Sequence, residues 1–490
     1  MIDWNLVGLA FTPYMIWICL LGTTLGILWG AMPGLSTTMA MALLIGLSAG
    51  MDQYPAIMFM LGVYTGSVFG GAISAVLINI PGTPDAVPTM MEGHALAKKG
   101  EGGLALGTAI AASFMGNWVG ILILISLIPV ILFLALLFRS WEMFLLAMWG
   151  IAICGSMSSG ELPLKGWISG WVGLLVAFTG LDAIHGTPRF TFGVGILEDG
   201  ISYIPILIGL FGLTEILRVL PKKNPTGIPQ EVGRVVPPFS MLWKYSRTAI
   251  RSGLIGTVIG AIPGAGANVA SFLSYDVARR RAKPEEQAKW GKGSYEGIVS
   301  AEVANNANVG GSMLPTLTLG IPGNAAAAAI LAALELKNVV VGPTIQVENP
   351  GLIYFIYFAL IIANFLMYGM AIALVKPCVK LFSLPPTLLM PLIIPICVIG
   401  AFAVNLNFFD VYIMFAAGIV GYILWRYGFP LAPMVLAVIL GPLADENLRR
   451  ALTIFEDKEW WFVLTQPVGT ILLVVVLYTF YDGIFKRGKK

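Results

Sequence analysis

The chain carries four Pro-Gly pairs inside or directly beside long apolar segments. They are Pro33-Gly34, Pro81-Gly82, Pro263-Gly264 and Pro322-Gly323. Proline has no backbone N–H to donate and glycine weakens a helix, so each pair is expected to interrupt a helix. Irregular backbone at the depth of a bilayer is tolerated only where it is buried in protein or lines a cavity. The pattern therefore predicts a membrane protein whose broken helices surround a central site.

The composition agrees with a polytopic membrane protein. Of the 490 residues, 57% are hydrophobic and 11% are charged, whereas soluble proteins carry about 25% charged residues. The net charge of +3 comes from basic residues in loops, and nothing in the chain suggests nucleic-acid binding. The four cysteines stand singly, without metal-binding or redox spacing, so we expect small buried side chains. The N-terminus lacks signal-peptide features, so we expect a first membrane segment there.

Apolar stretches near the 20 or so residues that cross a bilayer occur throughout the chain. We predict an all-α fold with about 12 membrane elements, some of which continue past a Pro-Gly pair. Their expected positions are 11–28 continuing to 49, 55–80, 107–137, 141–157, 167–181, 201–217, 252–262 continuing to 275, 299–319 continuing to 334, 352–375, 385–404, 411–425, 429–443 and 469–484.

The two halves of the chain share a repeated pattern. Pro33 and Pro263 are 230 positions apart (263 − 33), and Pro81 and Pro322 are 241 apart (322 − 81). At the first offset, further glycine and alanine residues also coincide. Two anchors in the same order indicate an internal duplication. We therefore divide the chain into a first membrane repeat (1–220), a cytoplasmic connector (221–251) and a second membrane repeat with a C-terminal helix (252–490).

Lysine and arginine in short loops indicate the cytoplasmic side of a membrane protein. Basic residues gather in the connector and again at 279–283, on both sides of Pro263-Gly264. The corresponding flanks in the first repeat, 1–10 and 49–54, carry none. This contrast predicts that 252–278 forms a re-entrant hairpin that enters from the cytoplasm. It also predicts that the two repeats have inverted topology.

After each break a new helix is expected to start with small or polar residues. The unpaired amides at a helix N-terminus can bind a carboxylate, and nearby hydroxyl or amide side chains can add hydrogen bonds. Simple capping of the helix is the alternative for each of these side chains. The predicted substrate-binding residues are Pro33, Gly34, Ser36, Thr37, Thr38, Pro81, Gly82, Thr83, Pro263, Gly264, Gly266, Asn268, Pro322, Gly323 and Asn324.

Oxygen-bearing side chains in apolar surroundings near the breaks are candidates for holding a coupling cation such as Na⁺. They are Asn79, Asp85, Asn305, Asn306 and Asn308. A buried asparagine costs free energy unless its amide finds partners. Hydrogen bonding between helices is therefore the alternative for the asparagines at 305–308. For Asp85, the alternatives are a cation site, a proton site and a loop cap.

Enzyme chemistry is not indicated by the sequence. Gly264-Ala265-Gly266 lacks the third glycine and the strand context of a dinucleotide-binding fingerprint, and no P-loop is present. His94 and His185 are expected to lie in different loops, and no His-Glu-x-x-His occurs. We predict no catalytic residues and no cofactor other than a coupling Na⁺ or H⁺.

The motifs at 30–36, 80–84 and 260–266 resemble those of the large membrane subunit of the bacterial tripartite tricarboxylate transporters. The resemblance also includes Gly70-Gly71, 189–193 and 428–446, and it covers essentially the whole chain. It implies a multi-pass secondary transporter of the bacterial cytoplasmic (inner) membrane. The partners that it implies are a small four-helix membrane subunit and a periplasmic solute-binding protein that delivers a carboxylate. It further implies uptake driven by a gradient of Na⁺ or H⁺.

The function expected from these observations is cation-coupled uptake of a di- or tricarboxylate by alternating access. An ion or solute channel with a broken-helix filter is the alternative. Basic residues are scarce in the apolar segments. An anionic substrate should therefore be held by helix N-termini and hydroxyls rather than by an arginine clamp. The alanine run after Asn324 should form a mostly apolar wall.

Overall fold

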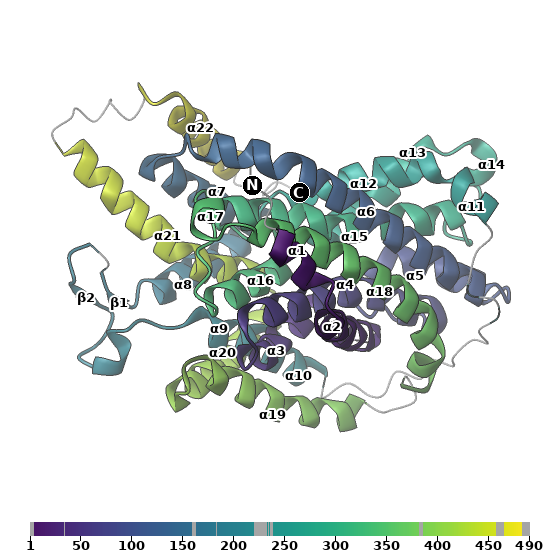
Figure 1. The fold of residues 1–490 in the computed structure, drawn as a ribbon, viewed down its shortest axis with the longest axis horizontal. Helices are drawn as coiled ribbons and strands as arrows, with labels where there is room; N and C mark the ends of the chain where they lie inside the picture. Colours follow the sequence, from purple (N-terminus) through teal and green to yellow (C-terminus); the bar gives the residue numbers. More distant parts are fainter. Residues whose placement is uncertain are drawn as a thin grey trace.

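The computed structural model of the protein is built almost entirely of helices. It describes residues 4–33, 35–158, 163–182, 184–219, 233, 235, 239–381, 386–456 and 465–482. In Figure 1 the molecule is elongated, with the strands β1 (Gly180–Leu181) and β2 (Pro188–Arg189) at one end and α13 (Gly266–Arg281) at the other. These strands pair antiparallel, with Gly180 opposite Arg189.

In the first half of the chain, the helical elements are α1 (Trp4–Ala10), α2 (Pro13–Ala31), α3 (Thr37–Ala49), α4 (Gln53–Ile78), η1 (Pro84–Ala86), α5 (Val87–Ala97), α6 (Gly102–Ala135), α7 (Ser140–Ser158), α8 (Pro163–Ala177), η2 (Gly195–Leu197), α9 (Tyr203–Leu207), the π-helical η3 (Ile208–Leu213) and α10 (Thr214–Val219).

In the second half they are α11 (Phe239–Lys244), α12 (Ser246–Gly260), α13, α14 (Pro284–Gln287), α15 (Tyr295–Leu319), α16 (Ala325–Glu335), α17 (Ile345–Glu348), α18 (Leu352–Leu381), α19 (Pro386–Asn405), α20 (Phe408–Arg426), α21 (Ala432–Phe455) and α22 (Pro467–Tyr481).

Five helices among the described residues are long and apolar enough to cross a membrane. They are α2, α4, α6, the 352–379 part of α18, and α20. Several shorter apolar helices, including α3 and α16, accompany them. The prediction of an all-α polytopic membrane protein is therefore confirmed. The number of 12 membrane elements stays a prediction.

The helices are interrupted where the Pro-Gly pairs predict. Helix α2 ends at Ala31 before Pro33, and α4 ends at Ile78 before Pro81. Likewise α12 ends at Gly260 before Pro263, and α15 ends at Leu319 before Pro322. Gly34 lies outside the described residues. We refer to the four connections, 32–36, 79–83, 261–265 and 320–324, as breaks one to four.

The helix that contains most of the predicted membrane segment at 429–443 extends beyond it. Helix α21 continues to Phe455 through a charged stretch. Arg449 pairs with Asp445 at 3.1 Å, and Arg450 pairs with Glu446, both at the i,i+4 spacing. Such pairs support a helix even where the sequence is polar.

Glycines pack α2 tightly onto α4, and α12 tightly onto α15. A Cβ added at Gly30 of α2 would lie 2.3 Å from Ser67 O of α4, and one at Gly260 of α12 would lie 2.8 Å from Asn308 O of α15. Ser67 and Asn308 are themselves 241 positions apart (308 − 67). The same contact therefore occurs at matching positions in both halves.

The paired helices run in the same direction. On α2 and α4, Gly22 meets Phe59 and Gly30 meets Ser67, so both residue numbers rise together. The same is true of α12 and α15, which pack against each other in the second half. Two parallel neighbours require the chain between them to turn back. In the first half that return is made by α3, and in the second half it is made by α13.

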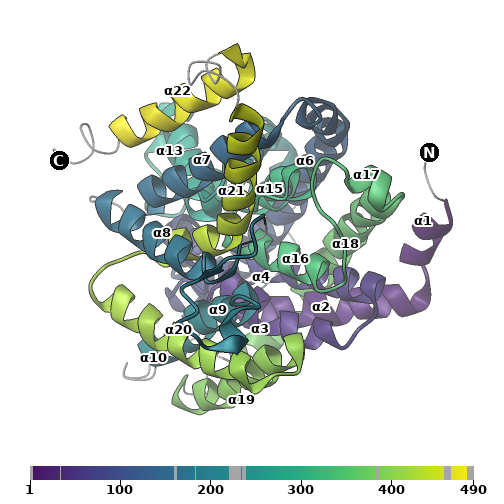
Figure 2. The ribbon, with the colours of Figure 1, turned by 90° about the vertical axis from the view of Figure 1, so that its left-hand side faces the viewer.

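Each half also packs onto the central helix of the other half. Helix α6 lies against α15, and α18 lies against α4. The largest buried cluster accordingly combines residues of both halves, such as Phe59, Ile330 and Phe355. Figure 2 shows α4 and α16 near the middle of the molecule, with α1 and α22 at its periphery.

Candidate functional site

The four breaks come together around one cavity of about 710 Å³. This volume lies within the range of about 300–1,000 Å³ found for small-molecule sites. Every break, together with the helix turn that follows it, contributes to the wall. The predicted substrate-binding residues that line the cavity are Ser36, Thr37, Thr38, Pro81, Gly82, Gly264, Gly266, Asn268 and Asn324.

Other predicted substrate-binding residues stand behind this wall. Thr83, Pro263, Pro322 and Gly323 are buried but do not line the cavity. Pro33 is partly exposed and does not line it either. Their positions fit a role in shaping the breaks rather than in contacting a ligand.

Direct contacts connect the breaks to one another. The amide of Gly264 in break three donates to Gly323 O in break four at 2.9 Å. The hydroxyl of Ser271 on α13 donates to Asp85 O, just after break two, at 2.9 Å. A Cβ added at Gly82 would lie 2.1 Å from Gly30 O, next to break one. The cavity wall is thus one connected set of backbone segments.

Gly264 can be replaced by no other residue without strain. Its φ of +78° lies in the left-handed region that favours glycine. An added Cβ would also lie 2.2 Å from the Cβ of Cys154 on α7. Both the turn of break three and its close approach to α7 therefore require glycine.

Three α-helices begin at the cavity. They are α3, α13 and α16, whose first turns contribute Thr37, Gly266 and Ala325 to its wall. The first amides of a helix have no partner within the helix and carry a partial positive charge. The convergence of these three N-termini favours a negatively charged ligand.

Two of the predicted side chains cap these helices. Ser36 Oγ accepts from Met39 N at 3.1 Å, and Asn324 Oδ1 accepts from Ala327 N at 2.8 Å. The capping alternative is thus realised for both residues, although they also face the cavity. Asn268 is exposed on the cavity wall, in the first turn of α13.

A tyrosine that the sequence interpretation missed holds break four in place. Tyr64 OH lies 2.8 Å from Ser312 Oγ, and Asn324 Nδ2 donates to Tyr64 OH at 2.9 Å. Asn324 Nδ2 also donates to Asn308 Oδ1 at 2.8 Å. Tyr64 lies 241 positions before Asn305 (305 − 64), which is the offset between the repeats. Its equivalence to the predicted site residue Asn305 could have identified Tyr64 from the sequence. Asn308 therefore links α15 to break four through a hydrogen bond.

The predicted cation-binding residues divide into two groups. Asp85 is buried beside Thr83 and Asn305. Among the described residues, Asp85 Oδ2, Thr83 Oγ1 and Asn305 Oδ1 are buried without a hydrogen-bond partner. Thr83 and Asn305 lie close enough to donate to Asp85, but a buried carboxylate without a counter-charge is costly unless a cation or a proton binds it. This cluster, which we call the Asp85 cluster, fits a small cation at the edge of the cavity.

The remaining two candidates lie elsewhere. Asn79 is exposed and ends α4 in a left-handed conformation, with φ of 57°. This is the position where asparagine commonly closes a helix. Asn306 Nδ2 donates to Glu302 O at 3.0 Å, and its Oδ1 accepts from Asn117 Nδ2 at 3.4 Å. Neither residue lines the cavity.

Arg218 lines the cavity from α10, although helix N-termini and hydroxyls rather than an arginine clamp were expected to hold an anion. Its Nη1 lies 2.7 Å from Glu215 Oε2, and its guanidinium lies 4.5 Å from the ring centroid of Trp425. Its Nε is buried and has no hydrogen-bond partner among the described residues. In the sequence, Arg218 lies directly before the basic connector and therefore resembles an ordinary cytoplasmic loop charge.

A second cavity of about 620 Å³ lies between the loop at 178–202 and helices α20 and α21. Among the described residues, its charged lining consists of Arg189 and the acids Glu198, Asp199, Asp410, Asp445 and Glu446. This excess of carboxylates is unfavourable for an organic anion. The cavity between the breaks is therefore the better candidate for a carboxylate site.

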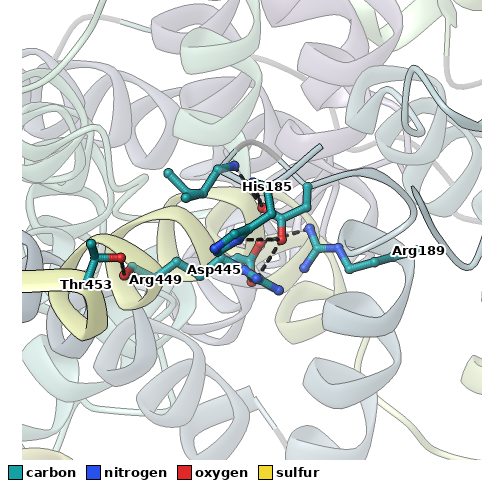
Figure 3. Close-up of polar contacts among 7 residues, drawn as sticks. His185, Arg189, Asp445, Arg449 and Thr453 are labelled. Atoms are coloured by element: carbon teal, nitrogen blue, oxygen red, sulfur yellow. Dashed lines mark hydrogen bonds and ion pairs between the residues drawn. The ribbon is translucent and has the colours of Figure 1, made fainter. Parts of the chain in front are cut away.

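Ion pairs dock the same loop onto α21. Arg449 lies 2.6 Å from Asp182 Oδ2, and Arg189 lies 2.9 Å from Asp445 Oδ2. Figure 3 shows Arg189 and Arg449 converging on Asp445. The backbone amide of Ile184 is the main cause that lowers the pKa of Asp182, followed by the amide of His185 and the charge of Arg449.

Comparison with known proteins decides the family. Residues 16–436 match the model of the "Tripartite tricarboxylate transporter TctA family". The chain belongs to the TctA family. An "Uncharacterized 52.8 kDa protein in TAR-I ttuC' 3'region" of Agrobacterium vitis is 36% identical over 476 residues, covering 96% of this chain and 93% of that protein. A second Agrobacterium vitis protein, "in TAR-II ttuC' 3'region", is 38% identical over 218 residues, or 44% and 89% of the two chains.

The TctA family is a family of transporters rather than of enzymes. Its tripartite name implies two further components, a small membrane subunit and a binding protein. Together with the five membrane-capable helices, this makes the chain a multi-pass membrane protein. No solved structure matches the chain.

Proposed function

We propose that this TctA protein takes up a di- or tricarboxylate, or a related organic anion, across the bacterial cytoplasmic membrane. It does so by alternating access and with a coupled cation. The observation that carries the proposal is the convergence of all four breaks on one cavity of about 710 Å³. A binding site at the junction of broken helices is typical of secondary transporters.

The charges of the wall suggest how substrate and cation are coupled. The described lining residues include two acids, Asp85 and Glu215, and one base, Arg218. With all three ionised, these side chains sum to one negative charge, and ionised Asp85 repels a carboxylate substrate. At about 4 Å and an effective dielectric constant near 20, one like-charge pair costs about 4 kcal/mol. A cation or proton at the Asp85 cluster removes that repulsion, so substrate and cation bind best together.

The substrate itself would be held by positive groups that face the cavity. Arg218 offers its guanidinium, and the first turns of α3, α13 and α16 offer backbone amides. Each helix N-terminus carries roughly half a positive charge. Thr37 and Thr38 add hydroxyl groups beside the first of these helices.

We further propose that the two repeats, 1–220 and 252–490, are inverted around this cavity and joined by the cytoplasmic connector 221–251. The matching glycine contacts and the parallel helix pairs support the duplication. So does the packing of α6 from the first half against α15 of the second, and of α18 from the second half against α4 of the first. Inverted repeats provide two similar structures that can open in turn to either side.

A panel of labelled di-, tri- and aromatic carboxylates taken up by vesicles tests the proposal. The three components are added separately, and Na⁺ and pH gradients are imposed independently. We expect saturable uptake that needs the binding protein, the small four-helix subunit and a cation gradient. Conductance through this subunit alone, without the binding protein, would instead indicate a channel. Uptake that responds to neither gradient would refute a secondary transporter.

A further inference from the structure

Glu302 is a fully buried carboxyl in the middle of α15. Thr89 Oγ1 donates to Glu302 Oε1 at 2.6 Å, and Ser113 Oγ donates to Glu302 Oε2 at 2.9 Å. Asn306 Nδ2 lies 3.5 Å from the same Oε2. Among the described residues, no lysine, arginine or histidine forms an ion pair with Glu302.

An ionised carboxylate at this buried position is unfavourable in free energy. An ionised group removed from water costs several kcal/mol unless a counter-charge compensates it. Binding a proton removes that cost. Hydroxyl groups suit both states, because Thr89 and Ser113 can donate to the carboxylate and accept from the carboxylic acid. The surroundings of Glu302 are thus built for a group that gains and loses a proton.

Other titratable groups around α15 leave Glu302 without a cation. Asp85 lies on η1, which packs against α15, and it acts on Glu302 as a like charge. Tyr64 on α4 is hydrogen-bonded to Ser312. On α5, Glu92 accepts from Tyr275 OH and from backbone amides at 291–294, while His94 Nδ1 lies 3.0 Å from Val76 O. Helix α12 carries Arg251 further toward its start, and α6 carries no charged residue.

We propose that Glu302 is a proton-binding site of transport, coupled to the substrate cavity through Asp85. Glu302 does not line the cavity, so it acts through charge rather than through contact with substrate. When Glu302 is protonated, the repulsion between it and Asp85 disappears, and the negative charge near the substrate falls. The proposal deepens the proposed function and rests on it.

The test compares wild type with Glu302→Gln in vesicles that contain the complete transporter. Net carboxylate accumulation is driven by a pH gradient of one unit with the membrane potential clamped. One coupled proton then supports about tenfold accumulation. The glutamine variant, fixed in the neutral form, should lose this accumulation. It should keep exchange of labelled for unlabelled substrate, which needs no release of the proton.

Glu296→Gln is the matched control. Glu296 lies on the same helix and accepts from Thr248 Oγ1 at 2.6 Å, as Glu302 does from Thr89. The Glu296→Gln variant should accumulate substrate to the same level as the wild type. Wild-type accumulation by Glu302→Gln would overturn the inference. Absence of saturable uptake in the wild type itself would instead overturn the proposed function.

A milder variant keeps the inference testable if Glu302→Gln does not fold. Ser113→Ala keeps the carboxyl and removes one of its donors. Loss of a hydrogen bond to the charged form raises the affinity for the proton, so the pH of half-maximal accumulation should rise by roughly one unit. An unchanged pH profile would overturn the inference.

Discussion

At the scale of single residues, Arg218 is the one basic side chain among the described residues that line the cavity. Its ring partner Trp425 and its acid partner Glu215 hold the guanidinium in place. Arginine recognises carboxylates through a fixed fork of donors.

Replacing this guanidinium should weaken substrate binding. A hydrogen bond to a charged group contributes about 1.5–3 kcal/mol, so Arg218→Gln should raise the KM for carboxylate roughly 10- to 150-fold. Arg218→Lys should recover part of this loss because it keeps the charge. Initial rates of uptake against substrate concentration measure the effect. A KM within twofold of wild type in the glutamine variant would remove Arg218 from the substrate site.

Gly264 permits a clean test of the geometry of break three. Gly264→Ala introduces backbone strain of about 1–2 kcal/mol and a clash with Cys154 that adds about 1–3 kcal/mol. Gly193→Ala is the matched control, because its φ of +75° is nearly the same while nothing lies within 4 Å. Thermal unfolding in detergent should show a clearly larger loss for Gly264→Ala. Equal losses would mean that α7 does not approach the break closely.

At the scale of elements, the loop between β1 and η2 is held to α21 by charge. The pKa of Asp182 is lowered first by the backbone amide of Ile184. A carboxyl whose pKa is lowered on folding stabilises the docked state above its ordinary pKa, near 3.9. That contribution is lost as the pH falls through the still lower folded value.

Docking of the loop should therefore weaken below about pH 4. Asp182→Asn should weaken it already at neutral pH, because the charge opposite Arg449 is removed. Hydrogen exchange of the amides at 184–200 reports the change. Phe192→Ala should behave like wild type, because Phe192 is 87% exposed. Exchange that is independent of both pH and the Asp182 substitution would show that the ion pairs do not hold the loop.

The sequence predicted the helices and their interruptions better than it predicted the residues of the site. Pro-Gly pairs and apolar lengths marked α2, α4, α12 and α15 with their breaks, because local chemistry decides where a helix stops. Which side chains meet depends on helix packing. Tyr64, Arg218 and Glu302 therefore remained hidden, although each is a single polar group in or beside an apolar segment.

At the scale of the whole molecule, the inverted repeat makes a topological prediction. Two cysteine substitutions test it: Asp52→Cys, just after α2 and α3, and Ala282→Cys, just after α12 and α13. If the repeats are inverted, a membrane-impermeant thiol reagent should label these positions from opposite sides. The four native cysteines are buried and should react slowly. Labelling of both positions from the same side would exclude the inversion.

The most direct test of the account asks whether the carboxylate occupies the cavity between the breaks. Asn268→Cys places a thiol on the cavity wall, and Asn407→Cys places one in the second cavity as a control. At a carboxylate concentration ten times its Kd, alkylation at position 268 should slow about tenfold, while position 407 should react unchanged. Equal labelling at position 268 with and without carboxylate, in a variant that still transports, would contradict a substrate site between the four breaks.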